Sequence, residues 1–167
     1  MEKYQDDEFF TIVKDILDNE EFKKTNNIVH HGITRFDHCM RVAYYSYIVS
    51  KTLHLDYKET TRAALLHDFF LDEVKEDNSV ARLRRHPMHA VNNAKKYFEI
   101  SEKQEDIIKT HMFPVTFTPP KYIESWIVDL VDDAAAVYEK TYTVKREIQA
   151  ATTFLFILLI NIVRMKI

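Results

Sequence analysis

FDHCMRVAYYSYIVSKTL, residues 36–53, places apolar side chains at intervals of three and four residues. That spacing is typical of a helix with one buried face, because each helical turn contains 3.6 residues. The expected buried stripe consists of His38, Val42, Tyr45 and Val49. An imidazole on such a stripe is costly to bury unless it is paired or binds a metal.

The same helical spacing recurs along the rest of the chain. It predicts further helices over residues 6–19, 57–67, 87–98, 101–111, 121–140 and 144–163. Pro87 is expected to open one of them, because proline suits a first helical turn. Ser101 and Gln104 form a capping-box pattern at the start of another.

The segments between these helices are expected to be loops. They include TNNIVHHGIT (25–34) and the charged residues 72–85. No stretch of useful length alternates as a strand would. The sequence therefore predicts an all-α protein of seven to eight helices, forming a single domain over residues 1–167.

The composition excludes several classes of protein. The only glycine, Gly32, excludes Walker-type and dinucleotide-type phosphate loops, which need several glycines. The only cysteine, Cys39, cannot form an internal disulfide. The net charge of −3 provides no basic field for a nucleic acid. The polar, acidic beginning of the chain does not resemble a signal peptide, and a cytoplasmic location is expected.

Residues 148–163, IQAATTFLFILLINIV, are apolar on all sides of the expected helix. They fall short of the roughly 18 to 20 residues that cross a bilayer, and Gln149 and Asn161 interrupt them. A core helix, or one partly buried in a homodimer interface, is the favoured interpretation. A membrane-associated tail ending in Arg164 and Lys166 is the alternative.

Histidine and aspartate side chains also occur on the inward faces of other expected helices. His67 and Asp68 end the 57–67 helix, and His111 ends the 101–111 helix. Asp132 shares a face with small apolar residues. Each alone is typical of a structural histidine or a capping carboxylate. Several such groups from different helices indicate that they meet, because burying them separately would be costly.

The ordered set His38, His67-Asp68 and Asp132 resembles the H…HD…D signature of the HD phosphohydrolase superfamily. The flanking sequences FDHCMRVAYYSYIVSKTL, AALLHDFF and LVDDAAAVYE are similar to that family's motif helices. The resemblance covers about residues 31–140. His86 and His111 look like the additional pair found in two-metal branches, which include the HD-GYP proteins and the bacterial diadenosine tetraphosphate hydrolases. No GYP element is present.

The resemblance implies an HD-domain helical bundle that binds two divalent metal ions. The first ion would be held by four groups, His38, His67, Asp68 and Asp132. If Asp68 bridges to a second ion, His86 and His111 become its further ligands. A nitrogen and oxygen set without thiolate suits iron, manganese, cobalt or zinc, with iron or manganese favoured. Cys39 is not expected to be a ligand, because its side chain points about 100° away from that of His38 on the same helix.

The resemblance also implies metal-assisted hydrolysis in which Asp68 orients or deprotonates the attacking water. Arg35, Arg82 and Arg85 are candidate phosphate-binding cations. The arginine run around residue 84 is equally well interpreted as a solvated surface. Lys121 is a weaker candidate.

Four other histidines are expected to lie outside the centre. His54 follows a helix end, where a left-handed backbone conformation is common. His89 lies one turn after His86. His30 and His31 fall in a loop, from which His31 would line the pocket entrance if it has a role.

Two aspartates near Asp132, Asp129 and Asp133, bear on the ligand set and on the charge of the site. Asp129, one turn before Asp132, is the rival for the last ligand, and Asp132 is preferred because it fits the family motif. Asp133 stands where close relatives would be expected to carry lysine. It makes the surroundings of the metal more negative.

The expected activity is hydrolysis of a phosphomonoester or phosphoanhydride in a small molecule, such as a nucleotide. Phe113, Phe117 and Trp126 could stack on a base, although aromatic residues near helix ends are more often core. The alternatives are a diiron oxygenase, built on the same ligand set in some HD proteins, and a non-catalytic module that senses a nucleotide. Phosphate release, oxygen uptake and binding without turnover would distinguish the three.

Overall fold

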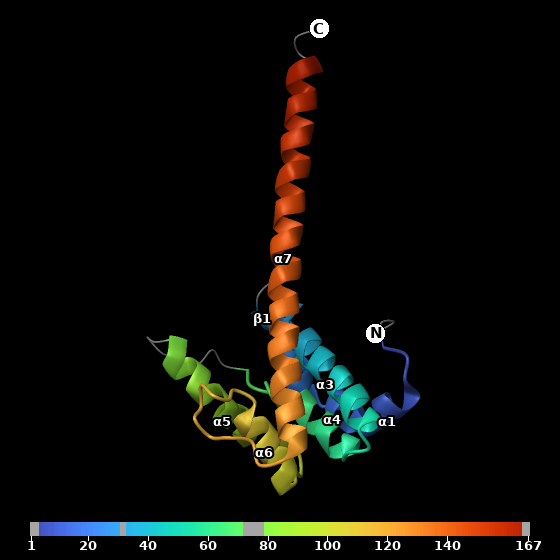
Figure 1. The fold of residues 1–167 in the computed structure, drawn as a ribbon. Helices are drawn as coiled ribbons and strands as arrows, with labels where there is room; N and C mark the ends of the chain where they lie inside the picture. Colours follow the sequence, from blue (N-terminus) through green and yellow to red (C-terminus); the bar gives the residue numbers. More distant parts are fainter. Residues whose placement is uncertain (1–3, 31–32, 72–78, 165–167) are drawn as a thin grey trace.

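A computed structural model describes residues 4–30, 33–71 and 79–164 of the chain. These residues form seven α-helices, one 3-10 turn and one two-stranded hairpin (Figure 1). The elements are α1 Asp7–Asp18, α2 Glu20–Lys23, η1 Lys24–Asn27, β1 Val29–His30, β2 Ile33–Thr34, α3 Arg35–Thr52, α4 Tyr57–Leu66, α5 Ser79–Tyr97, α6 Glu102–Thr110 and α7 Ile123–Arg164. The prediction of an all-α protein is confirmed.

Helices α3 and α4 form the centre of the domain, and α1, α6 and α7 pack around them. The α3–α4 connection turns at His54, whose φ of 56° is the left-handed conformation expected from the sequence. The capping box at the start of α6 is also confirmed, since Gln104 N donates to Ser101 Oγ at 3.1 Å. A short antiparallel hairpin pairing Val29 with Thr34 lies in the segment that was expected to be a loop.

The buried face of α3 differs from the predicted stripe. Val42 is fully buried, but Tyr45 and Val49 are 49% and 36% exposed. Small residues such as Ser46 and Ser50 are buried in their place. Because small side chains let α4 approach α3 closely, steric fit outweighs hydrophobicity on this face.

The prediction that Pro87 opens a helix is wrong. Helix α5 begins at Ser79, and Pro87 lies inside it. An internal proline costs about 3 kcal/mol. On the same helix, Ala90, Val91 and Ala94 are buried in the core, and this packing offsets the cost. Residues 79–85 are therefore helical rather than a loop, although Leu83, Arg84 and Arg85 are exposed as expected, and residues 72–78 lie outside the described part of the chain.

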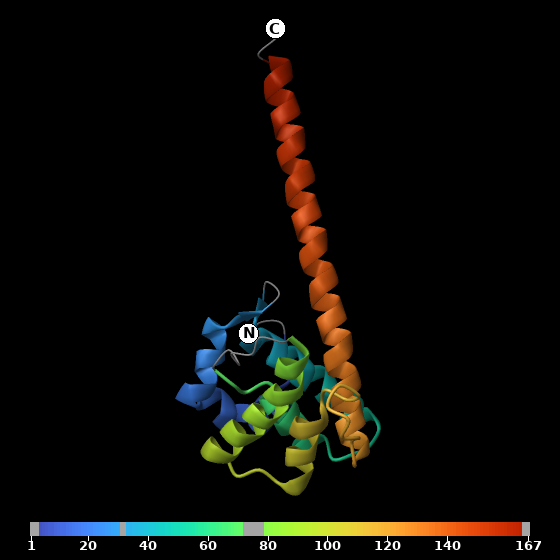
Figure 2. The same ribbon diagram turned by 90° about the vertical axis from the view of Figure 1, so that its left-hand side faces the viewer.

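The last two predicted helices form one continuous helix, α7. The three residues between them contain neither glycine nor proline, so nothing in the backbone ends the helix there. Its N-terminal part packs on α3, α4 and α6. Its C-terminal part projects far from the domain (Figure 2). The prediction of a separate C-terminal core helix is therefore wrong. No helical stretch within the described residues combines the length and the hydropathy needed to cross a bilayer.

Candidate metal centre

His67 and His111 are oriented by the same local device at the ends of two helices. Each is the C-cap residue of its helix, α4 for His67 and α6 for His111. His67 Nδ1 donates to Ala64 O at 2.7 Å, and His111 Nδ1 donates to Ile108 O, also at 2.7 Å. Because a carbonyl only accepts hydrogen bonds, Nδ1 carries the proton in both rings. Each Nε2 is therefore turned into the site, where the neutral form of the ring offers its lone pair.

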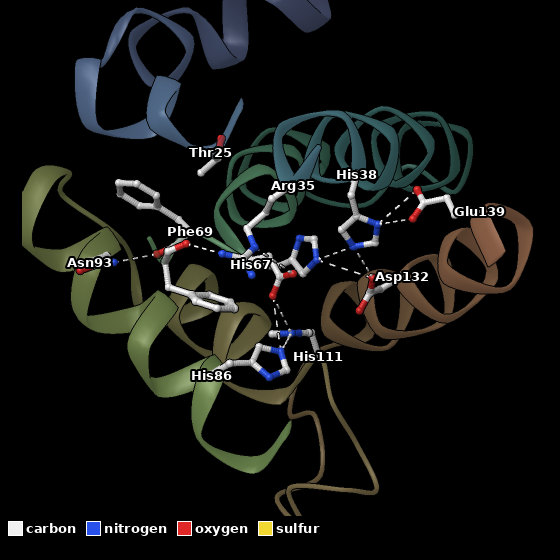
Figure 3. A network of polar contacts seen from close by, with 12 residues as sticks. Thr25, Arg35, His38, His67, Phe69, His86, Asn93, His111, Asp132 and Glu139 are labelled. Carbon is white, nitrogen blue, oxygen red and sulfur yellow. Dashed lines mark hydrogen bonds and ion pairs between the residues drawn. The ribbon is translucent and has the colours of Figure 1, made fainter. Parts of the chain in front are cut away.

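His38 reaches the same site from the first turns of α3 (Figure 3). Its Nε2 lies 2.9 Å from Asp132 Oδ1 and 3.3 Å from His67 Nε2. Its Nδ1 lies 3.0 Å from Glu139 Oε2. Asp132 and Glu139 both belong to α7. This helix therefore provides a carboxylate for each nitrogen of the ring.

His86 and Asp68 complete the group on the other side. His86 Nε2 lies 2.9 Å from His111 Nε2 and 3.4 Å from Asp68 Oδ1. Asp68 Oδ1 is buried and has no hydrogen-bond partner among the described residues. A buried carboxylate oxygen without a hydrogen-bond partner is energetically costly, so this atom is suited to bind a cation.

The spacing of these atoms fits metal coordination. Three groups of ligand atoms lie within 4.8 Å of one another. They are His38 with His67 and Asp68, His67 with His111 and Asp132, and Asp68 with His86 and His111. Neighbouring ligands at about 2.1 Å from an ion lie roughly 3.0 Å apart in an octahedron and roughly 3.4 Å in a tetrahedron. The nitrogen–nitrogen distances of 2.9 and 3.3 Å match those edges.

The side chains of the centre shift one another's pKa values. Burial alone would lower the pKa of His38, but hydrogen bonds to Asp132 and Glu139 outweigh it and raise the pKa to about 10. Burial and the neighbouring imidazoles of His67 and His86 lower the pKa of His111 to about 3. For Asp68, burial is opposed by the surrounding imidazoles, which hold its pKa well below the usual range. The surroundings thus favour a protonated imidazole at His38, a neutral imidazole at His111 and an ionised carboxylate at Asp68.

Metal binding should therefore release protons and strengthen as the pH rises. His38 holds a proton below its pKa of about 10, and an ion on Nε2 must displace it. We expect affinity for Mn²⁺ to rise about tenfold per pH unit, for each proton displaced, between pH 6 and 8. Calorimetry in buffers of different ionisation enthalpy would count the protons. Glu139→Gln removes one carboxylate partner of His38 and should reduce that count. An affinity independent of pH would contradict this charge assignment.

Asp132, rather than its rival Asp129, lies among the imidazoles. Asp129 Oδ1 instead accepts a hydrogen bond from Phe113 N at 3.2 Å. Burial and the charge of Asp133 raise the pKa of Asp129 to about 7. Asp129 therefore anchors the loop after α6. Asp133 lines the same pocket as the centre, as the extra negative charge noted in the sequence.

The candidate phosphate-binding arginines are placed differently from one another. Arg35 is buried beside the centre, with Nε 4.0 Å from Asp68 Oδ2. Its Nη1 donates to Phe70 O at 2.6 Å, and its guanidinium stacks on the Phe70 ring. Arg84 Nε donates to Val115 O, and Arg85 is exposed outside the pocket. The side chain of Arg82 lies outside the described part of the chain.

A pocket of about 240 Å³ opens onto the centre. Arg35 and Asp133 line it together with the centre, and Leu83, Met112 and Ala136 provide apolar walls. The aromatic candidates do not line it. Phe113 packs edge-on against Trp126 with ring centroids 5.3 Å apart, and Phe117 lies over Arg84.

The remaining candidates lie away from the centre. His54 and His89 are exposed. The side chain of His30 and all of His31 lie outside the described part. Lys121 N donates to Asp106 Oδ2, and its side chain is exposed. Cys39 is fully buried and belongs to none of the three ligand groups.

Glu139 is the residue of the site that sequence reasoning missed. It is 6% exposed and also pairs with Arg41, one turn after His38 on α3. A signal was present, because Glu139 follows Asp132 by seven residues and such residues share a helical face. Carboxylates that hold the far nitrogen of a metal-ligating histidine fix its tautomer and orientation.

The family model of the HD domain matches residues 35–137. Neither a curated protein nor a solved structure matches the chain. The match begins at the first residue of α3 and includes all six predicted ligands. HD domains are commonly metal-dependent hydrolases. Because the matched residues make up more than half of the 167-residue chain, the protein belongs to the HD domain family.

Proposed function

We propose that this protein is a two-metal phosphohydrolase that acts on a small phosphorylated molecule, with a nucleotide as the expected substrate. The observation that carries the proposal is Asp68 Oδ1, which is buried without a hydrogen-bond partner among the described residues. It lies 3.4 Å from His86 Nε2 and 3.7 Å from His111 Nε2. A carboxylate between two sets of imidazoles is suited to bridge two ions.

The ligands divide into two overlapping sets in this proposal. His38, His67, Asp68 and Asp132 hold the first ion. Asp68, His86 and His111 hold the second. The ligands are imidazole and carboxylate without thiolate, which favours iron or manganese and leaves zinc and cobalt possible.

When bound, the ions supply an activated water and positive charge for the phosphoryl oxygens. The protein's own residues then position the reactants. Asp68 lines the pocket and would orient or deprotonate the attacking water. Arg35 places a guanidinium, fixed by Phe70, beside the expected position of the phosphate. His67 and His111 keep their Nε2 atoms aimed inward through the carbonyl bonds of their own helices.

The pocket supports a substrate whose phosphate enters first. Its volume of about 240 Å³ is smaller than a typical cavity for a drug-sized ligand, which is roughly 300 to 1,000 Å³. A phosphomonoester or phosphoanhydride end fits inside, and the rest of the molecule remains near the pocket mouth. Asp133 lines the same pocket and disfavours highly charged substrates.

Metal analysis of the purified protein, followed by a phosphate-release screen across nucleotides, tests the proposal. We expect about two ions per chain and release of inorganic phosphate from at least one nucleotide. Oxygen uptake by the iron-loaded protein without phosphate release would favour the oxygenase alternative. Nucleotide binding without turnover under any metal would favour a sensing module.

His86→Ala isolates the second ion. We expect this variant to keep its helical circular dichroism and to keep one of two ions, because the first ligand set is intact. We expect it to lose the second ion and, with it, most of its activity. His89→Ala is the matched control, since His89 is exposed one turn later on the same helix. If the wild type carries one ion and His86→Ala changes neither metal content nor rate, the two-metal assignment is wrong.

A further inference from the structure

Helix α7 has two faces with different neighbours. Residues such as Val128, Ala135 and Glu139 are buried against the domain. On the opposite side, Leu130 is 64% exposed and Val137 is 68% exposed. Seven residues make almost two full turns, so Leu130 and Val137 share that outer face.

The outer face continues as a heptad repeat along the whole helix. Its first set of positions is Ile127, Ala134, Thr141, Ile148, Leu155 and Ile162. Its second set is Leu130, Val137, Val144, Ala151 and Leu158. The two sets alternate at spacings of three and four residues, and every position except Thr141 is apolar. We call these eleven positions the α7 seam.

Such a seam is the pattern of a coiled coil. Apolar heptad positions sustained over three to four heptads indicate helix pairing, and the α7 seam runs for roughly five. In its first half, Leu130, Val137 and Val144 are exposed among the described residues, whereas Ile127 is partly buried. Its second half lies on the part of α7 that projects from the domain (Figures 1 and 2).

We propose that a second copy of this chain covers the α7 seam, and that the two α7 helices pair as an antiparallel coiled coil. A heptad seam is self-complementary, so an identical helix fits it without any further feature.

The charges beside the seam select the antiparallel direction. Lys140 and Glu147 lie on one flank, and Tyr138 and Lys145 lie on the other. A parallel pair would place Lys140 opposite Lys145 of the partner subunit, and two such like-charge contacts would form. An antiparallel pair with Thr141 opposite Val144 of the partner subunit places Lys140 opposite the partner subunit's Glu147. Symmetry then gives two attractive contacts.

This register brings the apolar end of each helix to the other copy's domain. The partner's residues 148–162 run alongside the first half of the seam. A groove of about 360 Å³ adjoins that half between α3 and α7, lined by Arg41, Tyr45, Val131 and Tyr138 among others. Residues 148–163 are apolar on all sides of the helix, which suits a helix that lies over a groove as well as against α7.

Multi-angle light scattering and disulfide trapping test the pairing on the full chain. We expect about 40 kDa, twice the 19.9 kDa of the chain. Leu130→Cys with Leu155→Cys should form an intermolecular disulfide, because these positions are opposite each other in the proposed register. Leu130→Cys alone should not, since its own copies lie far apart. Buried Cys39 does not compete.

Charge variants test the direction of pairing. Lys140→Glu should weaken the dimer about tenfold by sedimentation equilibrium, because two attractive contacts become repulsive. Lys140→Glu with Glu147→Lys should restore it. Lys109→Glu on α6 makes the same charge change on another exposed surface and should leave the dimer unchanged. In a parallel pair, Lys140→Glu would instead strengthen association.

Three results would overturn the proposal. They are a monomer at all protein concentrations, efficient disulfide trapping of Leu130→Cys alone, and flotation of a monomer with phosphatidylcholine–phosphatidylglycerol vesicles. The last result would assign the seam to a lipid surface.

Discussion

Asp68→Asn is expected to leave the protein folded but unable to hold either ion. Asp68 belongs to two of the three ligand groups found among the described residues, one with His38 and His67 and one with His86 and His111, whereas Asp132 belongs to one. The amide keeps the side-chain shape and removes the charge that the imidazoles surround. We expect phosphate release to fall on the order of 10⁴-fold, equivalent to about 5 kcal/mol of activation free energy.

The matched control for this change is Asp133→Asn. It removes the same charge from the same pocket but from a residue outside the three ligand groups. Metal content measured by mass spectrometry should stay at the wild-type value in the control and fall to near zero in Asp68→Asn. Retention of both ions and of the wild-type rate in Asp68→Asn would remove the basis for a bridging carboxylate.

Asp132→Asn is expected to lose the ion held with His38 and His67, and Asp129→Asn is expected to keep both ions. Asp132 Oδ1 lies 2.9 Å from His38 Nε2, whereas Asp129 Oδ1 accepts from the backbone of Phe113. The rate should fall roughly 10³-fold in Asp132→Asn, or about 4 kcal/mol. Metal loss in Asp129→Asn with retention in Asp132→Asn would reverse the assignment.

Asp129→Asn is also expected to stabilise the protein above the pH at which Asp129 ionises. The pKa of Asp129 in the folded protein, about 7, lies above the usual value of 3.8. The unfolded state therefore gives up this proton at lower pH, and the wild type loses stability as the pH rises from about 4 to 7. The amide cannot ionise and still accepts from Phe113. The gain in melting temperature from Asp129→Asn should be larger at pH 8 than at pH 4.

The helices that could be predicted from sequence are those with local signals. The capping box of Ser101 and the left-handed turn at His54 depend on neighbouring residues alone, and both are present in the structure. The error at Pro87 has a different origin. Proline is unfavourable inside a helix, and only the burial of the following turns against the rest of the domain offsets that cost. The sequence pattern around Pro87 therefore cannot predict this packing against distant parts of the chain.

The same distinction applies to the candidate site. The order of histidines and aspartates identified the residues that meet, because their spacing along the chain resembles a family. The hydrogen bonds of His67 and His111 to their own helices, and the contact of Glu139 with His38, depend on three-dimensional positions. The exposed Tyr45 shows the same limit, since hydrophobicity alone placed it in the core.

The ion pairs around His38 have a consequence for the order of folding and metal loading. His38 contacts Asp132 and Glu139, and Glu139 also contacts Arg41. These charges therefore neutralise one another before any ion arrives. Small metal-binding domains such as zinc fingers fold only with their metal, whereas this domain also has a hydrophobic core that includes Phe9, Val42 and Ile107. Here the chain can complete its fold first and receive its ions afterwards, so a chelator should return an intact domain that can be reloaded.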